Sequence, residues 1–177
     1  MRIEKLRQEI ALDIRWSVFP LHPDTPEDGI RLDDLFAGQM DIPAMLARLK
    51  DVADELKLPF GARSQTFNSR RAQELGKWAE EMGQGDEFHA AAYRAYFVDG
   101  LNIALPEELA KVAATIDLDP EIAIQVLADG RYAAAVNADW HRAADLNVTA
   151  VPTVICGDRQ LVGFQPYDAF RRLIISE

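Results

Sequence analysis

Residues 41–147 carry a helical pattern of apolar side chains almost without interruption, and this block lies between two segments with strand patterns. Apolar residues at every third or fourth position indicate amphipathic helices, whereas strict alternation indicates a half-buried strand. Every second residue of "LDIRWSVF" (12–19) is apolar, so we expect an edge strand there. No motif recurs at a constant period in the helical block, which argues against a solenoid.

Residues typical of helix ends divide the helical block. Asn68 or Ser69 is expected to cap a helix, and Pro106 should open another. Asp119 is expected to cap a helix that Gly130 ends. The first of these helices carries an apolar stripe made of Ala72, Leu75, Trp78, Ala79 and Met82.

Both ends of the chain have patterns of their own. "MRIEKLRQEI" (1–10) has helical spacing but no capping residue before it, so the chain is predicted to begin inside a helix. "VPTVIC" (151–156) is apolar on both faces, which is typical of a central strand. "GDRQ" is expected to turn this strand into "LVGF" (161–164) as a hairpin, and Pro166 should start a last helix.

The order of these elements implies a missing neighbour. A helix that runs into a strand is normally the second half of a strand, helix, strand unit, which needs an earlier parallel strand beside it. The predicted helix at residues 1–10 has no such strand before it in this sequence. We therefore expect that strand to be missing from the chain or supplied from elsewhere.

Charge and cysteine content exclude several functions. The chain has 177 residues and a formal net charge of -10, which would repel a phosphate backbone or an anionic bilayer. No nucleic-acid or membrane partner is expected, and without an apolar run of about 20 residues or a secretory signal the chain is predicted to be cytoplasmic. Its single cysteine, Cys156, excludes a disulfide framework and agrees with a reducing compartment.

Four stretches in order carry a resemblance to a known family. They are "IRWSVFPLHPDTPEDG", "FNSRRAQELGKWAEEMG", "AAYRAYFVDGLNI" and "VTAVPTVICGDRQLVGFQPYDAF". In these stretches the chain resembles the DsbA family of thioredoxin-like oxidoreductases, and within it the FrnE-like branch, which neighbours the glutathione-dependent 2-hydroxychromene-2-carboxylate isomerases. The resemblance covers nearly the whole chain.

The resemblance implies an α/β thioredoxin-like fold with a large all-helical insertion. Residues 1–40 and 147–177 would form the thioredoxin-like part, and residues 41–146 the helical insertion with its connecting helices. The family's first central strand and the Cys-x-x-Cys motif after it would both precede residue 1, so we expect the chain to be truncated at its N-terminus. A short protein that has lost its thiol chemistry is the alternative.

The resemblance also implies a substrate-binding region. Val151 and Pro152 match the loop in which the family's proline bond is cis and whose backbone holds an extended peptide; an ordinary strand-starting proline is the alternative. His22 would lie at the same end of the sheet, where an imidazole can steady a thiolate, unless it is a loop histidine bonded to nearby backbone. Asn68 resembles the asparagine beside the substrate cleft, with simple helix capping as its alternative.

No catalytic residue, metal ligand or cofactor is predicted within the chain. Cys156 would sit about 13 Å along its strand from Pro152, at about 3.3 Å per residue, and is expected to be a small packing residue in an apolar strand. His89 and His141 lie on separate predicted helices, and neither has a ligand partner three or four residues away.

The sequence thus predicts a DsbA-like, FrnE-like thiol-disulfide oxidoreductase whose redox motif is absent from these residues. Its partners would be a protein or peptide thiol or disulfide, with glutathione and a homodimer as further candidates. A glutathione-dependent isomerase or transferase and a non-catalytic peptide-binding module are the alternatives. The chain alone is not expected to perform dithiol chemistry.

Overall fold

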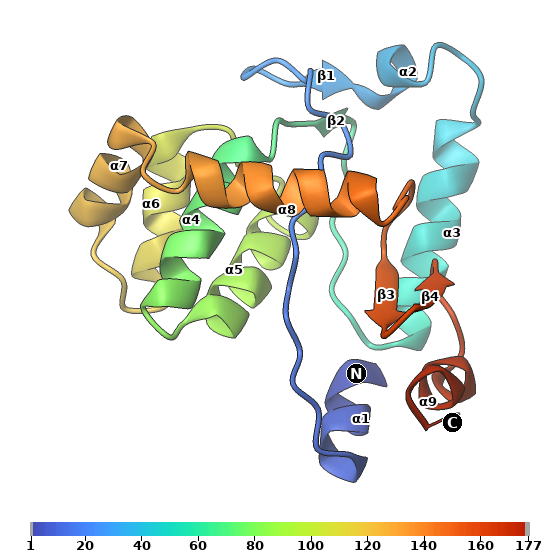
Figure 1. Cartoon of the computed structure of the whole chain (residues 1–177). Helices are drawn as coiled ribbons and strands as arrows, with labels where there is room; N and C mark the ends of the chain where they lie inside the picture. Colours follow the sequence, from blue (N-terminus) through green and yellow to red (C-terminus); the bar gives the residue numbers. More distant parts are fainter. Residues whose placement is uncertain (1, 176–177) are drawn as a thin grey trace. The chain divides into compact units, whose positions relative to one another are not determined.

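The computed structural model describes residues 2–175, which are mostly helical with a few short strands (Figure 1). The helices are α1 (Arg2–Glu9), α2 (Leu32–Leu35), α3 (Ile42–Glu55), α4 (Arg70–Glu81), α5 (Gly85–Phe97), α6 (Pro106–Ala114), α7 (Pro120–Asp129), α8 (Ala133–Asp145) and α9 (Tyr167–Ile175). The strands are β1 (Ile30–Arg31), β2 (Gln65–Thr66), β3 (Thr153–Cys156) and β4 (Arg159–Val162).

The elements form two compact units, each described by itself. One unit contains residues 2–21 and 137–175 of the described chain, and the other is His22–Val136. The boundary between Val136 and Asn137 falls inside α8. The division predicted from the sequence follows the expected fold rather than contacts between residues, and it stays a prediction.

The core of the second unit lies among α4, α5, α6 and α7, which pack against one another (Figure 1). The predicted stripe of α4 is buried at Ala72, Leu75, Trp78 and Ala79. Met82 was predicted to belong to this stripe, but its side chain is 48% exposed. It lies one residue beyond the end of α4, directly before the chain turns at Gly83, which has a φ of 76°.

Several predicted helix ends are confirmed. Asp119 precedes α7, and its Oδ1 accepts hydrogen bonds from the backbone amides of Glu121 and Ile122 at 2.8 and 3.2 Å. Gly130 follows α7 with a φ of 62°, a left-handed conformation that glycine adopts without steric cost. Pro106 is the first residue of α6, where its missing amide hydrogen costs no helical bond.

The second unit also holds a two-stranded sheet that the sequence did not predict. β1 and β2 are antiparallel, with Ile30 opposite Thr66 and Arg31 opposite Gln65. Each strand has two residues, which is too short for an alternating pattern to be recognised.

In the first unit, the predicted hairpin is confirmed with a shorter turn. β3 and β4 are antiparallel, with Thr153 opposite Val162 and Cys156 opposite Arg159. The turn is therefore Gly157 and Asp158 alone, and Gly157 has a φ of 64°. β4 is the one strand partner of β3 in the described chain, so the second neighbour that a central strand needs does not occur within residues 2–175.

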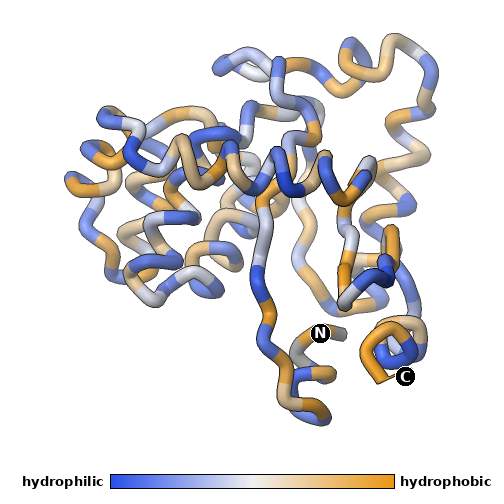
Figure 2. The backbone as a smooth tube through the Cα atoms, in the orientation of Figure 1, coloured by the Kyte–Doolittle hydropathy of each residue, from blue (hydrophilic) through white to orange (hydrophobic). Residues whose placement is uncertain are grey.

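The strand predicted at residues 12–19 is wrong, because this segment pairs with no strand among residues 2–175. Its alternation survives in burial only over residues 12–15: Leu12 and Ile14 are half-buried and Asp13 and Arg15 are exposed, but Trp16, which should follow on the apolar side, is 37% exposed. Figure 2 shows the same alternation of hydrophobic and hydrophilic residues along the extended chain after α1. Period two therefore predicted an extended backbone, but a strand also needs a neighbouring backbone to bond.

Both ends of the described part of the chain are helical, as expected. Leu6 of α1 is 1% exposed, and Phe170 and Leu173 of α9 are buried. The Tyr167 hydroxyl of α9 donates a hydrogen bond of 2.5 Å to the Glu9 carboxylate of α1, and the Lys5 ammonium lies 4.2 Å from the centre of the Tyr167 ring. Among residues 2–175, no helix is long and apolar enough to cross a membrane.

Candidate functional site

The loop between α8 and β3 holds Val151 and Pro152, whose peptide bond is cis as the family resemblance implies. The Pro152 carbonyl accepts a hydrogen bond of 2.7 Å from the backbone amide of Gly163, one residue beyond the paired strands. The Thr153 hydroxyl donates a bond of 2.6 Å back to the Ala150 carbonyl. These two bonds fasten the loop on both sides of Val151.

Val151 itself is left unpaired. Its side chain belongs to the exposed hydrophobic residues, at 44% exposure. Within the described chain its backbone amide and carbonyl have no hydrogen-bond partner, although both neighbouring residues do. An exposed residue with a free donor and a free acceptor can pair with one residue of an extended peptide.

His22 begins a loop, residues 22–29, that lies in the second unit. Its ring packs edge-on against the Phe36 ring, with centroids 6.4 Å apart and an interplanar angle of 87°. Its carbonyl accepts a hydrogen bond of 3.3 Å from the Thr25 amide. Neither ring nitrogen has a hydrogen-bond partner among residues 2–175, and the role of the His22 side chain stays a prediction.

Asn68 lies before α4 and contacts the same loop. Its Nδ2 donates hydrogen bonds to the carbonyls of Pro23 and Thr25 at 3.0 and 2.8 Å. Its Oδ1 accepts a bond of 2.9 Å from the Arg70 amide, which partly satisfies the first turn of α4. Asn68 therefore does more than cap a helix, because it also holds the residues that follow His22.

A second asparagine, which sequence reasoning missed, holds the other end of this loop. The Nδ2 of Asn102 donates a hydrogen bond of 2.9 Å to the Glu27 carbonyl, and its Oδ1 accepts one of 2.9 Å from the Ala104 amide. The available signal was weak: an asparagine before a proline-initiated helix favours a bond to the backbone two residues on. Nothing in that signal points to Glu27, 75 residues away.

The four predicted site residues thus fall into two pairs. His22 and Asn68 belong to the second unit, where Asn68 bonds the residue next to His22. Val151 and Pro152 belong to the first unit. Their roles in binding a substrate stay predictions.

Cys156 ends β3 at the turn of the hairpin, opposite Arg159. This is the far end of the strand from Pro152, as predicted. The cysteine is half-buried rather than buried in a core, because β3 is covered only in part along its length. Its position separates its thiol from the loop at Val151.

The histidines of the helices do not gather metal ligands. His89 stacks on Tyr93 with centroids 5.0 Å apart, and burial lowers the pKa of its imidazole below the usual value. His141 is exposed on α8. Within the described residues, no group of three or more His, Cys, Asp or Glu side chains could hold a metal ion.

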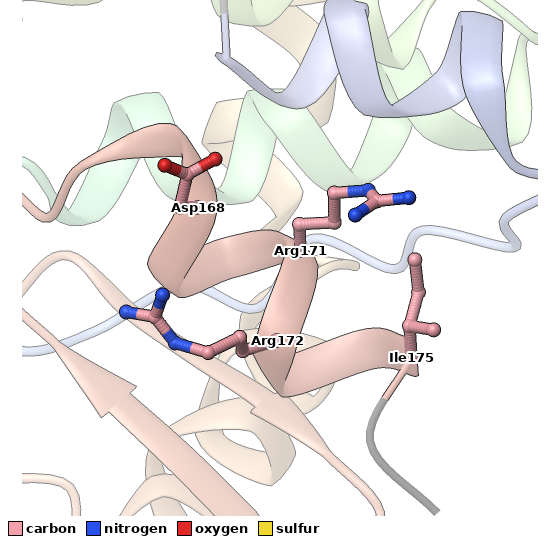
Figure 3. Close-up of a pocket in the computed structure, with 4 residues that line it drawn as sticks. All are labelled: Asp168, Arg171, Arg172 and Ile175. Atoms are coloured by element: carbon pink, nitrogen blue, oxygen red, sulfur yellow. The ribbon is translucent and has the colours of Figure 1, made fainter.

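A surface pocket of about 280 Å³ lies on α9, lined by Asp168, Arg171, Arg172 and Ile175 (Figure 3). All four residues belong to the same helix and all are exposed. None of the predicted site residues lines it. Its shape is that of a shallow surface depression, and it adds no functional group to the loops described above.

Solved structures share this fold. A probable DsbA oxidoreductase from Streptomyces coelicolor matches with a TM-score of 0.86 and 26% sequence identity, over 97% of this chain and 79% of that one. The structure of a 2-hydroxychromene-2-carboxylate isomerase matches with a TM-score of 0.71 and 19% identity, over 97% of this chain and 83% of that one. The second match shows the fold alone.

Sequence comparison leads to the same family. The uncharacterized protein YwbO of Bacillus subtilis (strain 168) is 30% identical over 101 residues, which are 56% of this chain and 50% of YwbO. The match thus spans about half the length of that curated relative. A model of the DSBA-like thioredoxin domain matches residues 1–174. The fold is therefore thioredoxin-like of the DsbA type, and the chain belongs to the DSBA-like thioredoxin domain family.

Proposed function

We propose that this chain is the substrate-binding part of a thiol-disulfide oxidoreductase of the FrnE-like branch, and that it takes an extended protein or peptide substrate. The observation that carries the proposal is the exposed backbone of Val151, whose amide and carbonyl have no partner in the described chain. The likeness to a probable DsbA oxidoreductase and the family match support the chemistry.

Val151 can contribute one bridge of an antiparallel strand pair. Its amide would donate to a substrate carbonyl while its carbonyl accepts from the same substrate residue. The bonds at Pro152 and between Thr153 and Ala150 hold the backbone on both sides of Val151, so less conformational entropy is lost when a peptide binds. Such binding recognises the backbone of the substrate through hydrogen bonds and therefore accepts many different side chains.

The thiols must come from outside these 177 residues, because the chain has one cysteine and an intramolecular disulfide needs two. We place a Cys-x-x-Cys before α1 in the full gene product. One thiolate attacks a sulfur of the substrate disulfide, the S–S bond breaks, and a mixed disulfide forms. The second thiolate then displaces the substrate sulfur, so the dithiol is oxidised, the substrate is reduced, and the reverse sequence oxidises a substrate dithiol.

Two measurements test the proposal. Reading the codons upstream of Met1 tests the source of the thiols: an in-frame strand followed by Cys-x-x-Cys supports it, and its absence contradicts it. Insulin reduction by that longer product tests the chemistry. A product with the motif but without this activity would remove the oxidoreductase assignment.

Binding is tested separately on the 177-residue chain. Val151→Pro removes the free amide and should weaken binding of the oxidised insulin B chain about tenfold, the effect of one hydrogen bond of about 1.4 kcal/mol. Thr149→Pro is the control, because Thr149 is also exposed and its amide has no partner among the described residues. Equal affinity of both variants and the unaltered chain would contradict the role of Val151.

A glutathione-dependent isomerase or transferase is the second candidate, favoured by the fold shared with 2-hydroxychromene-2-carboxylate isomerase. It requires a serine or a lone cysteine in place of the Cys-x-x-Cys. Calorimetric titration of the longer product with glutathione distinguishes the two, since no heat of binding would count against the isomerase. If the chain binds peptides and neither activity is measured, the protein is a non-catalytic binding module.

A further inference from the structure

The loop at residues 22–29 is held at two points, in each case by an asparagine side chain that donates hydrogen bonds to loop carbonyls. Asn68 bonds the carbonyls of Pro23 and Thr25, and Asn102 bonds the carbonyl of Glu27. In both asparagines, Nδ2 donates to the loop while Oδ1 accepts from the backbone amide two residues later in the chain. Each side chain is therefore fixed at its oxygen before its nitrogen contacts the loop.

Further contacts converge on the Asn102 end of the loop. Arg71 donates from one guanidinium nitrogen to the Glu27 carboxylate and to the Ala104 carbonyl, the latter at 2.7 Å. Ala104 is the residue whose amide holds Asn102. The backbone and the side chain of Glu27 are thus both bonded to groups that are themselves fixed around Ala104.

The loop ends at a position that only glycine fits. Gly29 has a φ of 87°, and a Cβ atom there would lie 2.6 Å from the Phe67 ring and 2.8 Å from the Thr66 carbonyl oxygen. Phe67 directly precedes Asn68, so the closing turn of the loop packs on the segment that holds its beginning.

The loop at residues 22–29 also contains a buried polar group without a hydrogen-bond partner. Thr25 is 7% exposed, and its buried Oγ1 has no hydrogen-bond partner. A buried hydroxyl without a partner opposes folding, so other contacts of the loop must offset this cost. Asn68 bonds the Thr25 carbonyl directly, while Asn102 and Arg71 bond Glu27, two residues further along the loop.

We propose that Asn102 is a positioning residue that, together with Asn68, holds the loop of His22 in the conformation that receives the substrate. That the loop receives a substrate rests on the proposed function. The hydrogen bonds by which the two asparagines hold the loop do not depend on that function. Asn102 makes no hydrogen bond to the His22 ring within the described chain; it acts through the Glu27 carbonyl.

Asn102→Asp isolates this contact. The carboxylate keeps an oxygen for the Ala104 amide, so the turn before α6 is retained, but it has no hydrogen to donate to the Glu27 carbonyl. We expect the amides of Thr25 and Gly29, which bond within the loop, to exchange with deuterium at least about tenfold faster than in the unaltered chain. The ring-proton signals of His22 should shift as the ring moves off Phe36.

Asn147→Asp is the matched control. It adds the same charge at an exposed asparagine whose side chain has no bond among the described residues, and it should leave loop exchange and His22 signals unchanged. Thr25→Val is a second control: it removes the unpartnered hydroxyl and should retain slow exchange in the loop. Unchanged exchange and unchanged His22 signals in Asn102→Asp would overturn the proposal.

Activity separates this inference from the proposed function. In the longer product with its thiols, Asn102→Asp should raise KM for a protein disulfide at least about fivefold and change kcat less than twofold, because a binding loop rather than the thiol is disturbed. An equal fall of kcat at constant KM would overturn the positioning role. If the unaltered longer product has no oxidoreductase activity, the proposed function fails, and the exchange measurement alone decides whether Asn102 holds the loop.

Discussion

The carboxylate of Asp139 accepts a hydrogen bond of 3.0 Å from the backbone amide of Val18. The same carboxylate, whose side chain is 1% exposed on α8, also accepts a bond of 3.1 Å from the Arg15 guanidinium. Asp139 thereby gives the extended segment 12–19 a hydrogen-bond partner that a strand would obtain from a neighbouring strand. A buried charge needs hydrogen bonds to offset its loss of water, and these two bonds also hold the segment.

Replacing Asp139 should destabilise the first unit. Asp139→Ala leaves the Val18 amide without its partner and is expected to lower the free energy of unfolding by about 2–4 kcal/mol. Urea denaturation measures this loss. Asp145→Ala, at an exposed position of the same helix, should change stability by less than about 0.5 kcal/mol, and an equal effect of both substitutions would show that the contact is not what matters.

Two glycines of the second unit should respond to alanine in opposite directions. A Cβ at Gly61 would clash with the Val98 carbonyl oxygen and lie 3.0 Å from the Val98 carbonyl carbon, both backbone atoms, so Gly61→Ala should cost about 1–3 kcal/mol. A Cβ at Gly76, inside α4, would meet the Phe88 ring at an ordinary 3.7 Å. Gly76→Ala should therefore raise stability by about 0.5–1 kcal/mol, as thermal and urea unfolding can measure.

His89 should make the protein less stable in mild acid. Burial lowers its pKa in the folded state, with smaller opposing effects from Asp86 and Glu80 and a further lowering by Lys77. The unfolded chain then binds a proton more readily, so the stabilisation is present above pH 6.5 and is lost as the pH falls through the lower folded pKa. Unfolding free energies at pH 7.5 and 5.0 should differ less in His89→Gln than in the unaltered chain.

Cys156 should be dispensable for substrate binding. It is half-buried at the turn end of β3, so Cys156→Ala is expected to cost no more than about 1 kcal/mol of stability. Affinity for the oxidised insulin B chain should remain within twofold. A loss of binding comparable to that of Val151→Pro would instead place this thiol in the site.

The sequence by itself determined the elements that depend on close neighbours along the chain. Pro106, Asp119 and Gly130 mark helix ends through bonds or backbone angles within three residues of each position. The β3–β4 hairpin likewise follows from one glycine and the apolar residues beside it. Short-range chemistry of this kind leaves a pattern that can be recognised without the rest of the molecule.

The tertiary structure decided everything that depends on a distant partner. Period two at residues 12–19 indicated an extended chain, but whether it forms a strand depended on its hydrogen-bond partner, and that partner is Asp139, 121 residues from Val18. In the same way, Asn68 was recognisable as a cap, whereas its hold on Pro23 and the matching role of Asn102 were not. Contacts across such separations depend on how helices and loops pack, so they cannot be predicted from the local pattern of apolar and polar residues.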